Sequence, residues 1–256
     1  MEIIKLDHAK NYRDLGGIKT TDGHTLKKCM LIRGTTLHKL SKKDVTLLQE
    51  KYRLATIIDL RTNKEAQEKP DSTLEGVEYF HCPVLSESVV GISHERRVKS
   101  FKSLEMMPSM EDLYISMVTD VSLTNMISVL KKILTFPPER FALVFHCSAG
   151  KDRTGILAAL LLAFLGVDRK TIVEDYLFTN KVTKAKAKFV YIVLLIARMS
   201  HKIAKKIRNY FLAQEDYIQT ALKTLEQRYG SLDNFFRVSL RFSDKEISDI
   251  KKKFLE

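Results

Sequence analysis

The decapeptide HCSAGKDRTG, residues 146–155, places a cysteine, a glycine and an arginine within seven residues. An apolar run, FALVF, precedes it, and a second, ILAALLLAFLG, follows, so the decapeptide joins a predicted buried strand to a predicted helix. A loop that opens a helix offers backbone amides to an anion. The decapeptide therefore predicts a phosphate-binding loop that carries a thiol.

Cys147 and Arg153 are the predicted catalytic residues of this loop. The positive loop stabilises a thiolate on Cys147, which is placed for in-line attack on a bound phosphorus. The planar guanidinium of Arg153 matches two phosphate oxygens and stabilises the charge of the transition state. Inert packing of a small cysteine is the alternative, but the coincidence of Cys, Arg and Thr with the strand–helix junction favours catalysis. The residues predicted to bind substrate here are Ser148, Ala149, Gly150, Lys151 and Thr154, with the Thr154 hydroxyl also expected to hydrogen-bond the sulfur.

The elements that position this loop are strands alternating with helices. Strand patterns cover 29–33, 54–60, 77–84 and 141–146; helical patterns cover 41–52, with Ser41 as N-cap, then 109–118, 122–134 and most of the chain after 153. This alternation predicts an α/β fold with a mostly parallel central sheet flanked by helices. Ligands bind beyond the carboxyl ends of such strands, where Cys147 is expected. The length and apolar composition, 256 residues and 45%, suit a single domain over 1–256.

The loop and its surroundings resemble a known family. His146-Cys147, five residues, then Arg153-Thr154 is similar to the signature of cysteine-dependent protein tyrosine phosphatases. The form with Lys151-Asp152 resembles the atypical bacterial tyrosine phosphatases, whose members often also hydrolyse phosphoinositides. Further similar segments follow in the same order: NYRDLGG (11–17), LIRGTTL (31–37), IDLRTNKE (58–65), EDYLFTN (174–180) and YGSLDNFF (229–236). The resemblance implies a phosphatase-type fold, a nucleophilic Cys147 and a phosphate-binding Arg153.

The general acid has two candidates. The chain contains no tryptophan, so the Trp-Pro-Asp loop of the classical enzymes is absent as such. Asp152 lies inside the phosphate loop, and the resemblance implies an acid at that position, so we favour it. Asp59 ends a predicted strand and is the alternative acid, although an ion pair with Arg61 would equally account for it.

Three further residues have two interpretations each. Lys151 resembles a lysine of lipid phosphatases that would contact a second phosphate, as on an inositol ring, or it only complements one phosphate. Arg13 is expected near anionic substrate at the site entrance, unless NYRDLGG is merely a turn. His146 is expected to support the loop through hydrogen bonds rather than to act as an acid.

Segment 181–214 carries nine Lys or Arg residues and no Asp or Glu. Apolar residues recur through it at near-helical spacing. Three interpretations stay open: a helical hairpin packed on the domain, a two-helix lid over the active site, and a helix on an anionic membrane surface. The resemblance favours the lid, since family members carry such an insertion, and a lid would protect Cys147 from oxidation.

Composition narrows the class of protein. The net charge of +12 favours anionic partners, yet no nucleic-acid-binding motif is present. Three cysteines are too few for a disulfide framework and match no zinc pattern, so we expect no metal or cofactor and a cytoplasmic location, although export without a signal peptide stays open. We expect an enzyme that hydrolyses phosphotyrosine in proteins, and phosphoinositides as a second substrate class. The alternative is a phosphoinositide- or phosphoprotein-binding module with weak turnover.

Overall fold

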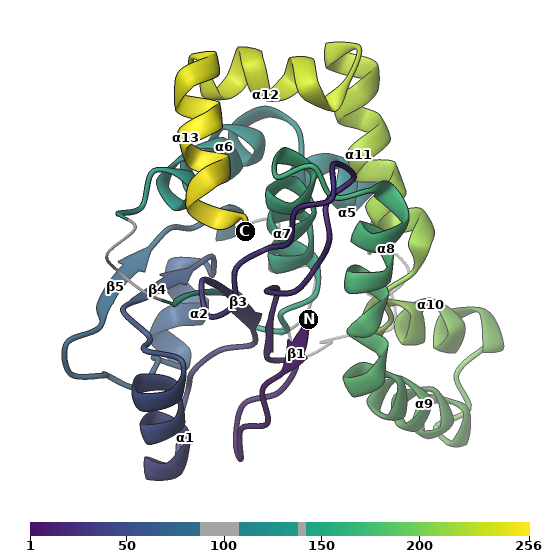
Figure 1. Ribbon diagram of the computed structural model, residues 1–256. Coiled ribbons are helices and arrows are strands. Elements are labelled where there is room, and N and C mark those ends of the chain that lie inside the picture. Colours follow the sequence, from purple (N-terminus) through teal and green to yellow (C-terminus); the bar gives the residue numbers. More distant parts are fainter. Residues whose placement is uncertain (88–107, 138–141) are drawn as a thin grey trace.

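The computed structural model describes residues 1–87, 108–137 and 142–256 (Figure 1). Within these residues one sheet has the strand order β1-β2-β3-β6-β4-β5. The central strands run parallel to one another, and the amino-terminal edge is antiparallel. The strand bounds are β1 Glu2–Ile3, β2 Arg13–Asp14, β3 Leu31–Gly34, β4 Thr56–Asp59, β5 Glu78–His81 and β6 Leu143–His146. The predicted α/β class with a mostly parallel sheet is confirmed.

The sheet separates two apolar clusters because side chains alternate along each strand. Ile58 of β4 and Phe145 of β6 point to the larger cluster, which also holds most of the helical side chains. Their neighbours Ile57 and Val144 point to the opposite face. There they pack with Leu48, which follows helix α1 (Lys42–Thr46) in the wider turn η1 (Leu47–Lys51). Both faces are therefore covered, as a parallel sheet requires.

Helix α7 (Asp152–Phe164) lies at the centre of the larger layer (Figure 1). Nearly every residue of this helix is buried, as expected for a helix that is apolar all round. Helices α6, α8, α11 and α12 contact it, while α5 packs on α6 and α11. Enclosure on all sides fixes the first turn of α7, and with it the loop that leads in from β6. The bounds of the covering helices are α5 Met110–Met117, α6 Asp120–Leu134, α8 Arg169–Phe178, α11 Glu215–Tyr229 and α12 Leu232–Leu240.

The predicted basic segment is a helical hairpin formed by α9 (Asn180–Ile196) and α10 (His201–Phe211). Tyr191 and His201 stack edge to face between the two helices, at 5.7 Å between ring centroids. Figure 1 shows the hairpin beside α8, projecting from the body of the molecule. Asn180 closes its base: its side chain donates to the Ala213 carbonyl at 2.7 Å and accepts from the Ala213 amide at 2.9 Å.

The strands and most helices occur where the sequence predicts them. Ser41 caps α1 as expected, with a reciprocal hydrogen bond to Asp44. Helix α2 (Asn63–Glu68) was not predicted, nor were the two short edge strands. The carboxyl-terminal helix α13 (Asp244–Phe254) ends beside the amino-terminal segment, where Leu255 bridges to Leu26. The predicted strand 141–146 is described from residue 142 only.

No single helix in the described ranges has both the length and the apolar character to cross a membrane. The pair α5 and α6 meets that length and composition test together, with a bend of 59° between the two helices. Both helices bury most of their apolar side chains in the larger cluster. The apolar composition of α5 and α6 is therefore explained by their packing in the core.

Candidate active site

The loop from Cys147 to Lys151 links β6 to the first turn of α7. Its tight course depends on Gly150, which has a φ of +62°. A Cβ at this position would lie 2.5 Å from the carbonyl oxygen of Gly34 on the neighbouring strand. Only glycine fits both the dihedral angle and the close approach. Lys151, at the N-cap of α7, makes no side-chain cap hydrogen bond, so the first amides of the helix remain available to an anion.

Glu65 of α2 holds Arg153 in place. The Arg153 guanidinium donates to both carboxylate oxygens, at 2.6 and 2.7 Å, and the Ser148 hydroxyl donates to Glu65 Oε1 at 2.6 Å. Burial alone would raise the pKa of Glu65, but these bonds and the Arg153 charge lower it to about 2. Burial disfavours the charge on Arg153, yet the hydrogen bonds to Glu65 and the electrostatic interactions with Cys147 and Glu65 raise the pKa of Arg153 above its ordinary value. The Arg153 guanidinium is therefore already oriented before an anion binds.

A buried network fixes the Gly150 carbonyl on the outer side of the loop. Asn11 Nδ2 donates to that oxygen at 3.0 Å and Arg33 Nη2 at 3.1 Å. Because the C=O and N–H of a trans peptide point in opposite directions, the Lys151 amide is directed away from Asn11 and Arg33. The network extends to Asp175 of α8, which pairs with Arg33 at 2.5 Å and with Arg13 at 2.7 Å. Residues far apart in the sequence therefore set the shape of the loop.

Arg13 does not lie at the site entrance, as the sequence predicts, but is completely buried. Its guanidinium donates to the Asp175 side chain, the Asp175 carbonyl and the Asn11 side chain. Burial, followed by the charge of Arg33, lowers the pKa of Arg13 to about 10 despite the partner carboxylate. Arg13 therefore does not lie at the site entrance as an exposed cation: it faces Arg33 across the sheet and pairs with the buried Asp175.

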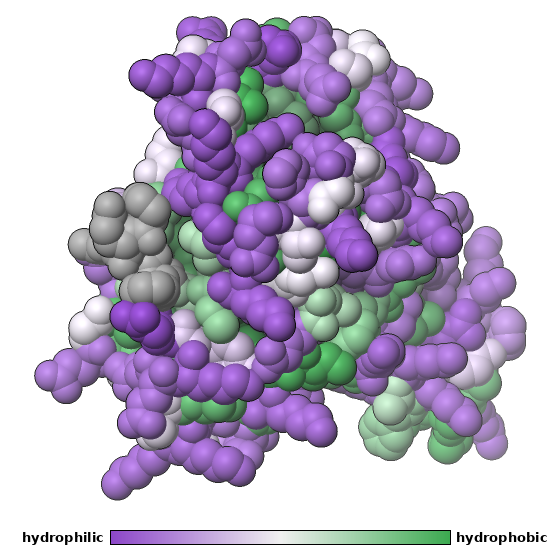
Figure 2. Space-filling model, in the orientation of Figure 1, coloured by the Kyte–Doolittle hydropathy of each residue, from purple (hydrophilic) through white to green (hydrophobic). Residues whose placement is uncertain are grey.

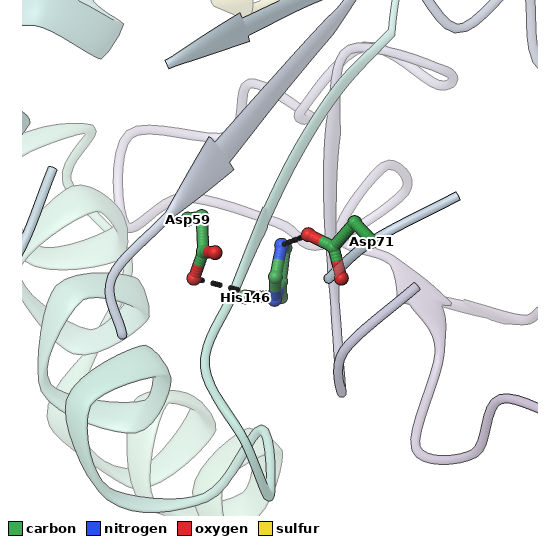
Figure 3. Close-up of side chains that lie close together, drawn as sticks. All are labelled: Asp59, Asp71 and His146. Carbon is green, nitrogen blue, oxygen red and sulfur yellow. Dashed lines mark ion pairs between the residues drawn. The ribbon is translucent and has the colours of Figure 1, made fainter. Parts of the chain in front are cut away.

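His146, the last residue of β6, lies between the carboxylates of Asp59 and Asp71 (Figure 3). Its Nε2 is 2.8 Å from Asp71 and its Nδ1 is 3.9 Å from Asp59. The Cys147 carbonyl lies 3.4 Å from Nδ1. The ring nitrogens thus lie near Asp59, Asp71 and the first carbonyl of the loop, an arrangement compatible with the predicted supporting role of His146. Asp59, Asp71 and His146 also have the spacing of metal ligands, but Arg61 occupies both carboxylates and supplies their counter-charge.

Asp59 is the less suitable of the two candidate acids. Its carboxylate accepts three bonds from the Arg61 guanidinium and one from the Tyr79 hydroxyl. Burial would raise the pKa of Asp59, but Arg61 and His146 lower it to about 2. The carboxylate has no proton to give at neutral pH. This geometry corresponds to the ion pair with Arg61 that the sequence also allowed.

Asp152 lies in the first turn of α7, one residue before Arg153, and is buried. Its Oδ1 accepts from the Tyr114 hydroxyl at 2.7 Å and lies 3.3 Å from the Lys151 ammonium. Tyr114 in turn shares a hydrogen bond of 2.6 Å with the Tyr176 hydroxyl. The carboxyl group is therefore held by a tyrosine pair at the edge of the phosphate loop.

Lys151 points away from the loop in this structure. Its ammonium donates to the carbonyls of Tyr210, at 2.5 Å, and Leu212, at 3.2 Å, and the residue is only 1% exposed. These carbonyls lie at the end of α10, where the helix dipole favours a cation. In this structure the Lys151 ammonium is bound to the hairpin, and its contact with a substrate phosphate stays a prediction.

The remaining predicted residues lie in the loop itself. Cys147 is 2% exposed, while Ser148 and Ala149 are half-buried. Thr154 is buried, and its hydroxyl makes no hydrogen bond within the described residues, so the predicted bond to sulfur is not formed here. The hydroxyl is left available to a group that enters the loop.

Several residues that build the site were not predicted: Glu65, Asp71, Tyr114, Arg33 and Asp175. One of them had a sequence signal. Thr62 and Glu65 have the spacing of a capping box directly after a strand, and both bonds of that box are formed. The box predicts a helix start at which a glutamate is held rigidly. Asp175 and Tyr114 carry no comparable local signal.

A buried cysteine at the end of β6 and a buried arginine in the first turn of α7 are the arrangement expected of a cysteine-dependent phosphatase. The model of the tyrosine phosphatase family matches residues 4–256, so the chain belongs to that family. The resemblance seen in the loop and its flanking segments is thereby confirmed, and with it the prediction of a phosphatase.

Two relatives cover nearly the whole chain. A predicted tyrosine-protein phosphatase of Cupriavidus necator is 28% identical over 239 residues, which is 93% of this chain and 84% of that protein. The triple specificity protein phosphatase PtpB of Mycobacterium tuberculosis is 26% identical over 265 residues, covering 93% and 94% of the two chains. Among solved structures, PTPMT1 in complex with PI(5)P aligns with a TM-score of 0.36 and 11% identity, over 72% of this chain and 92% of that chain.

Proposed function

We propose that this chain hydrolyses phosphomonoesters through a phosphocysteine intermediate on Cys147. The bidentate pair of Arg153 with Glu65 carries the proposal, because it presents a rigid guanidinium beside the thiol in a loop that opens α7. Such a rigid donor set stabilises transition-state charge without reorganisation during the reaction.

In the first step the Cys147 thiolate attacks phosphorus, an S–P bond forms and the P–O bond to the leaving group breaks. The leaving oxygen takes a proton from the general acid. In the second step water attacks phosphorus, gives its proton to the same carboxylate, and the S–P bond breaks to release inorganic phosphate and the thiolate. The thiolate and the carboxylic acid both return to their initial states, so the cycle consumes only the ester and one water molecule.

Asp152 is the proposed acid. Its carboxyl group accepts from the Tyr114 hydroxyl and lies 3.3 Å from the Lys151 ammonium, at the edge of the loop. A dianionic phosphate ester bound in the adjacent loop would favour the protonated form of this carboxyl group, because like charges repel. Substrate binding thus favours protonation of the Asp152 carboxyl group. Asp59, with its pKa lowered to about 2 by Arg61 and His146, has no such route to a proton.

The proposed substrates are phosphotyrosine in proteins and phosphoinositides. The name of the Mycobacterium relative, a triple specificity protein phosphatase, supports a range wider than phosphotyrosine. Lys151 supports the lipid substrates: once freed from the Tyr210 and Leu212 carbonyls, its ammonium would meet a second phosphate next to the one bound by Arg153. The contact of Lys151 with α10 also supports a lid role for the α9–α10 hairpin.

Specificity constants for a phosphotyrosine peptide, a phosphoserine peptide and a short-chain phosphoinositide test this proposal. Cys147→Ser should abolish turnover of every substrate while leaving binding intact, and Cys82→Ser, which alters a half-buried cysteine outside the loop, should keep full turnover. Release of phosphate by the Cys147→Ser protein at the wild-type rate would disprove the phosphocysteine. Binding of phosphoinositides without any turnover by the wild type would instead identify a binding module.

A further inference from the structure

Helix α9 exposes an unusual amount of apolar surface. Phe189 is 67% exposed and Ile196 is 77% exposed, and Ile192, Val193 and Leu195 between them are also exposed. Only Ala187 is buried in the whole helix. Single exposed apolar residues are ordinary, but five within eight positions form a contiguous patch of the kind that marks an interaction site. We refer to residues 189–196 as the apolar patch.

Basic residues flank the apolar patch on both sides along the chain. Lys181, Lys184, Lys186 and Lys188 precede it, and Arg198, Lys202 and Lys205 follow it, all of them exposed. The hairpin contains no acidic residue to neutralise them. Figure 2 shows hydrophobic atoms at the lower right, where Figure 1 places α9, bordered by hydrophilic atoms. A lipid surface with anionic headgroups complements both features, since apolar side chains enter the acyl boundary while lysines contact phosphates.

The other end of the hairpin is attached to the active site. Lys151 donates to the Tyr210 and Leu212 carbonyls, and these lie beside the base formed by Asn180 and Ala213. Tyr210 belongs to α10, so a shift of α10 relative to α7 would move its carbonyl away from Lys151. The Lys151 ammonium would then be free to turn toward the phosphate loop.

We propose that the apolar patch docks on an anionic phospholipid bilayer, and that docking releases Lys151 from the hairpin toward the phosphate loop. This inference rests on the proposed phosphoinositide phosphatase function, whose substrates are themselves bilayer lipids. Docking then brings the enzyme to its substrate and completes the site for a second phosphate in one movement.

Vesicle flotation tests the docking. The wild type should float with vesicles of phosphatidylcholine containing phosphatidylglycerol, should do so less as salt is added, and should not float with phosphatidylcholine alone. The variant Phe189→Ser/Ile196→Ser should lose at least tenfold in binding. The matched control Val121→Ser/Val238→Ser removes two apolar side chains of similar exposure, 72% and 52%, from α6 and α12, and should bind like the wild type.

Lysine acetylation read by mass spectrometry tests the coupling. In free protein Lys151 should be protected, and anionic vesicles should raise its acetylation several-fold while lowering that of Lys188. In Phe189→Ser/Ile196→Ser the vesicles should leave Lys151 protected. Vesicle binding with Lys151 still protected would overturn the coupling.

The docking inference fails if the wild type does not bind anionic vesicles, or if the patch variant and the control variant bind equally. It also fails if sedimentation shows a wild-type dimer that Phe189→Ser/Ile196→Ser dissociates, because a second copy then covers the patch. Hydrolysis of a soluble phosphotyrosine peptide by the same samples separates this failure from failure of the proposed function. The patch variant should keep the wild-type rate on that peptide, whereas a chain without phosphatase activity would hydrolyse it in no form.

Discussion

The Glu65 carboxylate accepts hydrogen bonds from both terminal nitrogens of Arg153, at 2.6 and 2.7 Å. Its Oε2 also accepts a hydrogen bond from the Thr62 amide at 2.9 Å. One carboxylate therefore caps helix α2 and orients the guanidinium of the phosphate loop. Because Thr62 and Glu65 are fixed to each other by a capping box, the position of Arg153 depends on the start of a neighbouring helix.

Replacing Glu65 should impair the site through Arg153. Glu65→Gln keeps the shape of the side chain but provides one acceptor oxygen and no charge. The Arg153 guanidinium then loses one of the two hydrogen bonds that orient it. We expect kcat/KM for a phosphotyrosine peptide to fall about 10²-fold, as for other small misplacements of a catalytic group. Glu68→Gln, at an exposed position of the same helix, should change it little. An unchanged rate for Glu65→Gln would show that the loop alone orients Arg153.

The Glu65–Arg153 pair should also make stability depend on acid pH. The pKa of Glu65 is lowered from 4.5 to about 2 in the folded protein, so its stabilisation is complete above the ordinary value and is lost as the pH falls toward 2. The loss should be on the order of 3 kcal/mol. Urea unfolding at a series of pH values measures it. The stability difference between wild type and Glu65→Gln should shrink over this interval; a constant difference would contradict the lowered pKa.

The two candidate acids should respond differently to the leaving group. Asp152→Asn should slow hydrolysis of phosphotyrosine by about 10²–10⁴-fold, because a phenolate of high pKa needs a proton. It should barely slow an aryl phosphate whose leaving group is already a weak base. Asp59→Asn removes the charge of one of the two carboxylates that pair with Arg61 and should lower the midpoint of urea unfolding, with equal effects on the hydrolysis of both substrates. Equal slowing of both substrates by Asp152→Asn would remove it as the acid.

Asn11 should contribute to catalysis without touching substrate. It has a φ of +58° and donates to the Gly150 carbonyl at 3.0 Å. Asn11→Gly keeps this backbone conformation accessible and removes the donor, which costs about 1 kcal/mol of loop alignment, or roughly fivefold in kcat/KM. Asn11→Ala adds the strain of a positive φ, so its larger unfolding penalty separates backbone from side-chain effects. Activity equal to wild type in Asn11→Gly would assign the loop shape to Arg33 alone.

Much of the fold follows from local sequence patterns. Strands β3, β4 and β6 are short apolar runs between turn signals, and the uniformly apolar α7 predicts a helix enclosed on all sides. The two-residue strands β1 and β2 were not predictable, since pairs this short have no periodicity. Helix α2 has only six residues, and its one signal is the capping box at Thr62.

The residues of the active site likewise include some that the sequence predicts and some that it does not. Cys147, Arg153 and Asp152 lie within one loop, so their spacing is visible in the sequence. The partners that aim them come from distant segments: Glu65 follows β4, Tyr114 belongs to α5 and Asp175 belongs to α8. Arg13 was misjudged for the same reason. A cation near a turn suggests an exposed substrate contact, and only the tertiary structure shows that the side chain faces Asp175.

The facing arginines of β2 and β3 have a consequence for how the chain assembles. Arg13 and Arg33 are direct partners across the sheet, and the carboxylate between them belongs to residue 175. Two like charges oppose closure of this edge until α8 arrives. During synthesis, strands β2 and β3 therefore cannot pair stably until more than two thirds of the polypeptide has been made. A fragment that stops short of α8 should leave its amino terminus open to proteases, even though every residue of that edge is already present.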